Sequence, residues 1–321
     1  MIVVTGAAGF IGSCLIQRLN QDFFNYIIAV DDFSSDVKIK NLQNKKIKLQ
    51  VHRNDFFDWL DTHHRHVEYI FHIGARTDTT ELDTNIFDRL NVAYSQKIWQ
   101  KCIEYQLPLV YASSAATYGS GSMGYDDAHD KISSLSPLNP YGISKNEFDK
   151  WALAQPHKPY SWVGLKFFNV YGPNEYHKGR MASVVYHGYH QIKKMGVIKL
   201  FKSHKSEYKD GEQLRDFIYV KDVVEVCMYF LYHRKLNGIY NLGTGTARTF
   251  NELATHTFDA LGMTPAIQYI DMPPDLLDKY QYFTEAKIQK LTDAGYRKAF
   301  YTLQEGVHEY VNQYLNLTHY Y

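Results

Sequence analysis

Residues 1–12 read MIVVTGAAGFIG, an apolar run that leads into the pattern Gly6-x-x-Gly9-x-x-Gly12. The apolar run predicts a buried strand, and residues 13–20 predict a helix that starts at the last glycine. In such a turn Gly6 permits the tight bend, Gly9 lets a pyrophosphate approach the backbone, and Gly12 allows close packing of the helix. Free N–H groups at the start of a helix bind this anion. The stretch therefore predicts a dinucleotide-binding fold.

The next strand is predicted at residues 26–30, and Asp31 and Asp32 stand at its carboxyl end. A carboxylate about 20 residues after the glycines hydrogen-bonds the adenosine ribose and repels a 2′-phosphate, which favours NAD. Lys38 and Lys40 follow closely, and their charges can neutralise a 2′-phosphate, which favours NADP. The residues themselves leave the choice between NAD and NADP open.

Strand-like and helix-like segments alternate along most of the chain. Further strands are predicted at residues 47–51, 67–72, 107–114, 162–168 and 239–242, and a long helix at 85–105. This alternation predicts an α/β fold, a doubly wound parallel Rossmann sheet with a smaller mixed α/β C-terminal substrate lobe. We expect residues 1–168 with about 216–242 to form the dinucleotide-binding domain. Residues of about 169–215 with 243–321 are expected to form the substrate lobe.

Tyr141 and Lys145 form a Tyr-x-x-x-Lys pattern on a predicted helix. Residues four apart share one helix face, and a neighbouring cation lowers a tyrosine pKa from about 10 toward the working pH. Ser114 closes the strand-like run upstream, so Tyr141 is the candidate general acid or base. A second Tyr-x-x-x-Lys begins at Tyr189, but Ser161 upstream of it opens a strand instead of closing one. We interpret Tyr189 as a packing residue.

The composition is that of an ordinary soluble globular protein, with 45% hydrophobic and 21% charged residues. A net charge of +1 and the lack of a basic run with interleaved aromatics predict no nucleic-acid and no membrane partner. The strand at the start leaves no room for a signal peptide, so we expect a cytoplasmic protein. Three separated cysteines and histidines 63, 64 and 66 lack the spacing of a disulfide framework or a metal site, so no metal is expected.

The order of these motifs resembles the extended short-chain dehydrogenase/reductase family, whose members modify nucleotide sugars. The resemblance is carried by Gly6-x-x-Gly9-x-x-Gly12, Ser114, Tyr141-x-x-x-Lys145, Asn169-Val-Tyr-Gly-Pro173 and Arg215-Asp-Phe217. A narrower resemblance is to the ADP-L-glycero-D-manno-heptose 6-epimerases of bacterial lipopolysaccharide core biosynthesis. It is carried by Tyr111-Ala-Ser-Ser-Ala-Ala-Thr-Tyr-Gly119, His177-Lys-Gly179 and Gly238-Ile-Tyr-Asn-Leu-Gly-Thr-Gly245.

The resemblance implies an isomerase that inverts C6 of ADP-D-glycero-D-manno-heptose by transient oxidation with tightly bound NADP, NAD being possible. In such enzymes Tyr141 would move the hydroxyl proton of one epimer, Lys145 would lower its pKa and hold the nicotinamide ribose, and Ser114 would orient the substrate oxygen. Lys178 matches a second acid/base group that serves the other face. The relatives form homo-oligomers, so a homo-oligomer is expected.

The resemblance also implies two sets of binding residues. The cofactor-binding positions are Gly6, Gly9, Phe10, Ile11, Gly12, Asp31, Asp32, Lys38, Arg53, Ile73, Gly74, Ala75, Arg76, Thr77, Asn91, Lys145, Val170 and Lys178. The substrate-binding positions are Ser114, Asn169, Arg180, Ser183, His187, Phe201, Arg215 and Tyr280. The guanidinium of Arg215 has the forked shape that binds phosphate oxygens in pairs.

Two alternatives stay open. Another nucleotide-sugar epimerase or reductase, acting at C4 of a UDP- or GDP-hexose, would use the same fold. A 4,6-dehydratase is disfavoured because residues 115–117 are Ala-Ala-Thr and lack the Asp-Glu pair that an elimination needs. A non-catalytic dinucleotide-binding protein would be free to lose Ser114, Tyr141 or Lys145, and all three are present.

Overall fold

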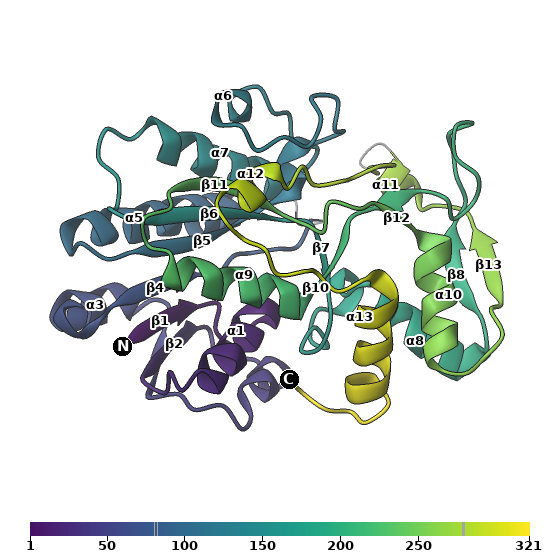
Figure 1. Ribbon diagram of the computed structural model, residues 1–321, viewed down its shortest axis with the longest axis horizontal. Coiled ribbons are helices and arrows are strands. Elements are labelled where there is room, and N and C mark those ends of the chain that lie inside the picture. The colour runs from purple at the N-terminus through teal and green to yellow at the C-terminus, as the bar shows by residue number, and fades with distance from the viewer. Residues whose placement is uncertain (80, 82, 278–279) are drawn as a thin grey trace.

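A computed structural model describes residues 1–79, 81, 83–277 and 280–321. Within this part of the chain, a seven-stranded sheet has the order β11-β6-β5-β4-β1-β2-β3, and all of its pairs are parallel (Figure 1). Its strands are β1 (Ile2–Thr5), β2 (Ile27–Asp31), β3 (Leu49–His52), β4 (Tyr69–His72), β5 (Leu109–Ser114), β6 (Trp162–Phe167) and β11 (Gly238–Leu242). The predicted doubly wound α/β fold is confirmed.

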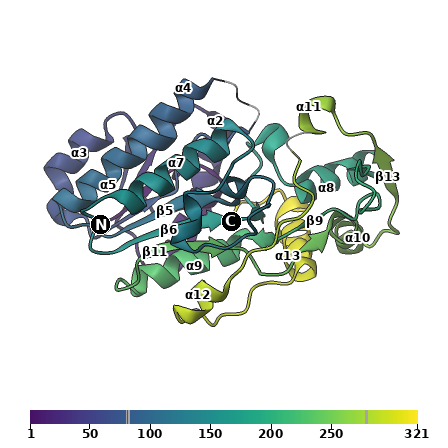
Figure 2. The ribbon, with the colours of Figure 1, turned by 90° about the horizontal axis from the view of Figure 1, so that it is seen from above.

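Helices cover both faces of this sheet. On one face α1 (Phe10–Gln21) packs against α9 (Val220–Tyr232), and the other face carries α3 (Phe56–His63), α5 (Tyr94–Glu104) and α7 (Pro140–Ala154) (Figure 2). The chain winds outward in both directions from β1, which pairs with β2 on one side and β4 on the other. Ligands of such sheets bind where the winding reverses, beyond the carboxyl ends of the strands.

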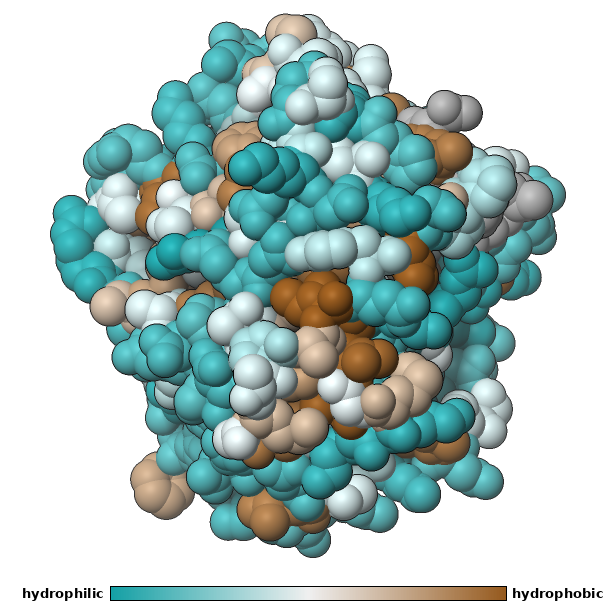
Figure 3. Space-filling model, turned by 90° about the vertical axis from the view of Figure 1, so that its right-hand side faces the viewer, coloured by the Kyte–Doolittle hydropathy of each residue, from teal (hydrophilic) through white to brown (hydrophobic). Residues whose placement is uncertain are grey.

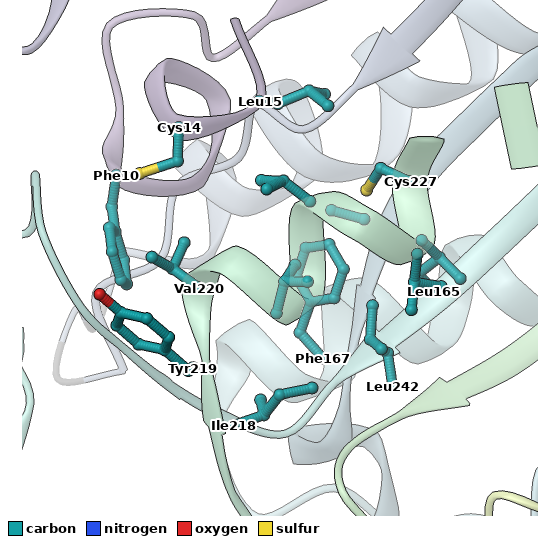
Figure 4. Close-up of a cluster of buried hydrophobic side chains, with 14 of the residues drawn as sticks. Phe10, Cys14, Leu15, Leu165, Phe167, Ile218, Tyr219, Val220, Cys227 and Leu242 are labelled. Carbon is teal, nitrogen blue, oxygen red and sulfur yellow. The ribbon is translucent and has the colours of Figure 1, made fainter. Parts of the chain in front are cut away.

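Each face has its own hydrophobic core. Between α1, α9 and β6, buried side chains from distant parts of the sequence meet, among them Cys14, Leu165, Val220 and Cys227 (Figure 4). On the other face Trp99 is fully buried and makes edge contacts with neighbouring aromatic rings. The cysteines at 14, 102 and 227 are buried and free. Burial of this apolar surface drives the two layers of helices onto the sheet.

The remaining elements gather beside the carboxyl ends of the sheet (Figure 1). Their strand pairs are β7 (Asn169–Tyr171) with β10 (Phe217–Tyr219), β9 (Leu214–Arg215) with β12 (Arg248–Thr249), and β8 (Ile198–Phe201) with β13 (Ile267–Ile270). Their helices include α8 (Val184–Met195), α10 (Phe250–Ala260) and α13 (Leu303–Glu309). The outer face of this region is largely polar, with apolar side chains gathered near its centre (Figure 3).

Shorter helical segments connect these parts. They are α2 (Asp36–Ile39), η1 (Lys40–Leu42), η2 (His64–His66), α4 (Thr84–Phe87), η3 (Asp88–Ala93), η4 (Ala115–Tyr118), α6 (His129–Ile132), η5 (Gly179–Met181), α11 (Pro274–Leu277), α12 (Gln289–Asp293) and η6 (Tyr310–Leu315). The sequence predicts one helix over residues 85–105, whereas the structure has a helical run with a π-helical segment, η3, between α4 and α5. Such π-helical segments are frequent at functional sites.

Candidate active site

A cavity of about 520 Å³ opens at the carboxyl ends of β1, β2 and β4. Most of the predicted cofactor residues line it. Those that do are Gly6, Gly9, Phe10, Ile11, Gly12, Asp31, Asp32, Lys38, Arg53, Ile73, Gly74, Ala75, Arg76, Thr77 and Lys178. The structure does not place Asn91, Lys145 or Val170 in this lining. The cavity is therefore the candidate dinucleotide site.

The glycine turn forms a close-packed wall of this cavity. Gly6 has a φ of +64°, and a Cβ there would lie 2.5 Å from the Cα of Gly74. A Cβ on Gly12 would lie 2.1 Å from the carbonyl oxygen of Gly6, so neither position tolerates a side chain. Helix α1 begins at Phe10 after the N-cap Gly9, and its first N–H groups point toward the cavity end of the helix. These features fit the pyrophosphate of a dinucleotide.

Two ion pairs lie at the end of β2. Asp31 accepts a hydrogen bond of 2.9 Å from the N–H of Ala8 and pairs with Lys38 at 2.5 Å. Asp32 pairs with Arg53 at 2.9 Å. Each carboxylate is thus balanced by a cation. The Nε atom of Arg53 is buried and has no hydrogen-bond partner among the described residues, so a donor is left over at this end of the cavity.

His72, at the end of β4, was not singled out by the sequence analysis. Its ring lies 2.7 Å from Thr5 Oγ1 and 2.9 Å from Ser95 Oγ, and it lines the cavity. Burial lowers the pKa of His72 to about 3, and the nearby Lys145 ammonium contributes to this decrease. The imidazole is therefore neutral at physiological pH, and it joins β1, β4 and α5 beneath the candidate dinucleotide site.

We expect the free energy of unfolding to fall as the pH decreases from 6.5 to about 3, because the unfolded chain takes up the His72 proton first. In a His72→Gln variant the slope of this dependence should be smaller by up to about 1.4 kcal/mol per pH unit. Denaturant unfolding at a series of pH values measures both slopes. His66→Gln is the control, since His66 is exposed. Equal slopes for His72→Gln and the wild type would contradict this expectation.

Tyr141 and Ser114 meet where α7 packs on the end of β5. Helix α7 is capped by Asn139, whose Oδ1 accepts a 2.8 Å hydrogen bond from Gly142 N–H. A Cβ on Gly142 would lie 2.8 Å from the carbonyl oxygen of Ala116, so only glycine allows this close approach of α7 to η4. The Ser114 side chain lies close enough to Tyr141 to lower the pKa of its hydroxyl. The structure therefore brings together two of the predicted catalytic residues.

The protonation of this pair differs from the sequence-based prediction. The Lys145 charge was expected to lower the pKa of Tyr141, but burial raises it, and the nearby Ser114 side chain opposes the increase. Burial also lowers the pKa of Lys145 to about 8, and its ammonium donates a 2.7 Å hydrogen bond to the carbonyl of Ala112. The prediction was wrong because it counted the neighbouring charge and left out the cost of burying a phenolate.

Asn91 supports the cavity from behind. It lies in the π-helical segment η3, and only 1% of its surface is exposed. Its side-chain amide exchanges hydrogen bonds of 2.8 and 3.0 Å with the backbone of Arg76 and donates one of 3.0 Å to Ser144 Oγ. Asn91 thus joins the cavity segment at Arg76 to helix α7. Its predicted contact with the cofactor stays a prediction.

Lys178 lines the cavity beside the glycine turn. Its Nζ lies 5.5 Å from the centre of the Phe10 ring. Burial lowers the pKa of Lys178, and the Glu175 carboxylate opposes this decrease. Glu175 is itself buried and accepts hydrogen bonds from the N–H and the hydroxyl of Ser183 at 2.6 and 2.7 Å. The Ser183 hydroxyl, predicted to bind substrate, is therefore already engaged, and it also caps α8.

Three of the predicted substrate residues gather beside the sheet. The Arg215 guanidinium lies 4.9 Å from the centre of the Tyr280 ring, and the Tyr280 and Phe201 rings are 6.5 Å apart. Arg215 is buried and donates to the carbonyls of Leu214 and Gln281. Burial lowers the pKa of Arg215.

The other predicted substrate residues are more scattered. Asn169 is exposed in β7, and its Oδ1 accepts a 3.4 Å hydrogen bond from Thr284, while Val170 follows it in the same strand. Arg180 is exposed in η5. His187 is half-buried on α8 with its ring 5.8 Å from that of Tyr186. Their contacts with substrate stay predictions.

A family model described as the NAD dependent epimerase/dehydratase family matches residues 2–243. The chain belongs to this family. It is 46% identical over 325 residues to an ADP-L-glycero-D-manno-heptose-6-epimerase of Fusobacterium nucleatum, and 98% of each chain is covered. It is 47% identical over 321 residues to the enzyme of the same name from Nitratidesulfovibrio vulgaris, again with 98% of each chain covered.

A crystal structure of Helicobacter pylori ADP-L-glycero-D-manno-heptose-6-epimerase is similar to this chain with a TM-score of 0.80 and 28% identity. The similarity covers 97% of this chain and 95% of that one. The relationship predicted from the sequence is confirmed, and the protein is an epimerase-family enzyme. Membership of the NAD dependent epimerase/dehydratase family also identifies the cofactor class as a nicotinamide dinucleotide.

Two further features concern this epimerase-family chain away from the cavity. No cluster of three or more metal-ligating side chains is found among the described residues. His63 instead stacks on Trp59 and His64 on Tyr105, with ring centres 4.9 and 3.9 Å apart. Within the same described ranges, no helix has the length and apolar character needed to cross a membrane.

Proposed function

We propose that the protein inverts C6 of ADP-D-glycero-D-manno-heptose to give ADP-L-glycero-D-manno-heptose, using a tightly bound nicotinamide dinucleotide. The observation that carries this proposal is identity of 46 and 47% to heptose 6-epimerases over 98% of the chain. The meeting of Tyr141 with Ser114 at the end of β5 supports the chemistry. We also propose that the enzyme is cytoplasmic and forms a homo-oligomer, as its relatives are expected to do.

The chemistry divides between the dinucleotide and the protein. When bound, the dinucleotide supplies reversible hydride transfer at C6, so that the carbinol passes through a ketone. The hydroxyl proton must leave and return at the same oxygen. Tyr141, with Ser114 orienting the oxygen, moves this proton for one epimer, and Lys178 moves it for the other. Lys145 holds the nicotinamide ribose.

Two acid–base groups suit an inversion better than one. The C6 oxygen points in different directions in the two epimers when the sugar is held by its nucleotide. Lys178 lies against Phe10, which opens α1, whereas Tyr141 lies on α7. Helices α1 and α7 cover opposite faces of the sheet, and we propose that the two groups act on opposite sides of C6.

We assign NADP as the preferred cofactor. The support is the Lys38 side chain and the Arg53 Nε, which has no partner in the described part of the chain, at the end of the cavity where the adenosine ribose is expected. Both cations are already paired with carboxylates, so a 2′-phosphate would meet two cations and two anions held in fixed positions. A phosphate oxygen would accept a stronger, charge-assisted hydrogen bond from the Arg53 Nε than a ribose hydroxyl would, which supports the assignment.

Lys38→Ala is expected to weaken NADP binding by about 10- to 100-fold, because one charge-assisted hydrogen bond is lost. NAD binding should change little, since NAD lacks the 2′-phosphate. Calorimetric titration of the nucleotide-stripped protein with each dinucleotide measures the two changes. Lys40→Ala is the matched control, because Lys40 is exposed two residues away. An equal loss of NAD and NADP affinity in Lys38→Ala would contradict the assignment.

We further propose that residues of about 169–215 and 243–321 form the substrate lobe, with Phe201, Arg215 and Tyr280 at the nucleotide. A panel of sugar nucleotides tests the substrate. We expect kcat/KM for ADP-D-glycero-D-manno-heptose to exceed the values for UDP- and GDP-hexoses by at least about 10³-fold. Faster C4 epimerisation of a UDP- or GDP-hexose would replace the heptose proposal with the alternative retained from the sequence. Dependence on added reduced dinucleotide in each turnover would indicate a reductase.

A further inference from the structure

Behind the proposed reaction centre lies a fully buried ion pair. Lys166 on β6 and Asp149 on α7 are 2.7 Å apart, and the side chains of both are 0% exposed. The Asp149 carboxylate also accepts hydrogen bonds from the hydroxyls of Ser113, at 2.6 Å, and Tyr111, at 3.0 Å. The Lys166 ammonium donates a second hydrogen bond, of 2.7 Å, to Thr117 Oγ1. The pair therefore joins four elements, β5, η4, α7 and β6.

These bonds converge on the last residues of β5. Ser113 is held by Asp149, and the carbonyl of Ser114 accepts a 2.8 Å hydrogen bond from Thr117, which Lys166 holds. The preceding residue, Ala112, accepts the hydrogen bond from Lys145. Three successive residues of the strand end that carries Ser114 are thus fixed by charged side chains or by their direct partners.

The space needed for this arrangement is provided by a glycine. A Cβ on Gly164 of β6 would lie 2.4 Å from the hydroxyl of Tyr111. Only glycine at this position lets the Tyr111 ring lie across β6 and reach Asp149. The absence of a side chain at Gly164 therefore allows Tyr111 to donate its hydrogen bond to the buried Asp149 carboxylate.

Asp149 also lies one helical turn after Lys145, on the same face of α7. Asp149 on α7 and His72 on β4 interact electrostatically with Lys145, and Lys166 on β6 is linked to Lys145 through its ion pair with Asp149. Burial lowers the pKa of Lys145, and Asp149 is the group that raises it. Asp149 also adds to the raised pKa of Tyr141.

Stability alone does not explain such a pair. Burying two charges costs about as much free energy as their attraction returns, and well-packed apolar replacements are often neutral or stabilising. We propose that Asp149 and Lys166 are positioning residues for the epimerisation, which fix the strand end at Ser114 and set the charge on Lys145. This inference rests on the proposed function for its catalytic meaning, while its electrostatic part concerns the protein alone.

Three variants separate the charge effect from packing. Asp149→Asn leaves Lys166 unbalanced, so the titration midpoint of Lys145 should move down by about one pH unit or more. Lys166→Met leaves Asp149 unbalanced and should move it up by a similar amount. The double variant Asp149→Asn/Lys166→Met removes both charges and should return the midpoint to within about 0.3 units of the wild type.

NMR titration of the lysine Cε signals measures these midpoints without substrate. The Lys145 signal is assigned by its loss in Lys145→Met. Where one single variant does not fold, the other single variant should still show a shifted midpoint and the double variant a midpoint near the wild-type value. A wild-type midpoint in either folded single variant would overturn the proposal and leave the pair a structural feature only.

Turnover completes the test. Asp149→Asn should lower kcat by about 10- to 100-fold with little change in KM, and the alkaline limb of its pH profile should move to lower pH with the Lys145 midpoint. A lower kcat with an unmoved pH profile would overturn the electrostatic role. If the wild type lacks heptose epimerase activity, the proposed function fails, while the NMR midpoints still decide the charge effect on Lys145.

Discussion

Tyr141→Phe is expected to lower kcat by about 10³-fold and to leave dinucleotide affinity within about twofold of the wild type. The substitution removes only the hydroxyl that moves the C6 proton. The ring that packs in the first turn of α7 remains, so the fold should be kept. Steady-state epimerisation and calorimetric titration with the dinucleotide measure the two quantities. Turnover at the wild-type rate would contradict the assignment of Tyr141.

The chain provides a matched control in its second Tyr-x-x-x-Lys. The Tyr189 hydroxyl lies 3.3 Å from the carbonyl of Leu315 and 3.1 Å from Asn316 Oδ1, which is a packing arrangement. Tyr189→Phe should lose about 1 kcal/mol of unfolding free energy and keep its kcat. Comparison of the two variants separates the loss of a reacting hydroxyl from the loss of any tyrosine hydroxyl.

Lys178→Met is expected to lower the rate of complete epimerisation by about 10²-fold or more, because one of the two epimers loses its acid/base group. The half-reaction that uses Tyr141 should persist. Mixing the variant with each epimer in a single turnover should therefore give reduced nicotinamide with one epimer and much less with the other. The near-ultraviolet absorbance of the reduced ring reports this asymmetry.

Two comparisons make this result specific. Tyr141→Phe should show the reverse asymmetry, since it retains Lys178. Lys193→Met, which changes an exposed lysine on α8, should behave as the wild type. Equal loss of both half-reactions in Lys178→Met would contradict the two-group mechanism, and no loss in either half-reaction would assign both proton transfers to Tyr141.

The sequence predicts those features of the structure that depend on a local pattern of residues. The run from Ile2 to Asp31 contains a strand, a glycine turn, a helix and a second strand in the order that the mechanism of pyrophosphate binding requires. Each of these is decided by neighbours in the sequence. The strand that ends at Ser114 is predicted by its apolar run in the same way.

The features that the sequence does not predict depend on contacts between residues far apart in the chain. Nothing in the sequence around Asp149 or Lys166 marks them as a fully buried pair, and His72 resembles any polar residue at the end of a strand. The pairing of β8 with β13 joins segments far apart in the chain, and each is too short to be predicted alone. The π-helical turn at Asn91 is set by its bonds to Arg76 and Ser144.

The pKa of Tyr141 illustrates the same limit. Spacing along a helix identifies a neighbouring cation, and this alone predicts a lowered pKa. Burial acts in the opposite direction and is a property of the whole fold. In the structure it is the largest influence on Tyr141, and it also brings the pKa of Lys145 down to about 8.

The central claim is that the protein epimerises an ADP-heptose with a dinucleotide that it retains. A proton NMR time course of the purified protein with ADP-D-glycero-D-manno-heptose and no added cofactor tests it most directly. We predict conversion to an equilibrium mixture that contains the L-glycero epimer. An unchanged spectrum, even after addition of NADP and then NAD, would contradict the claim.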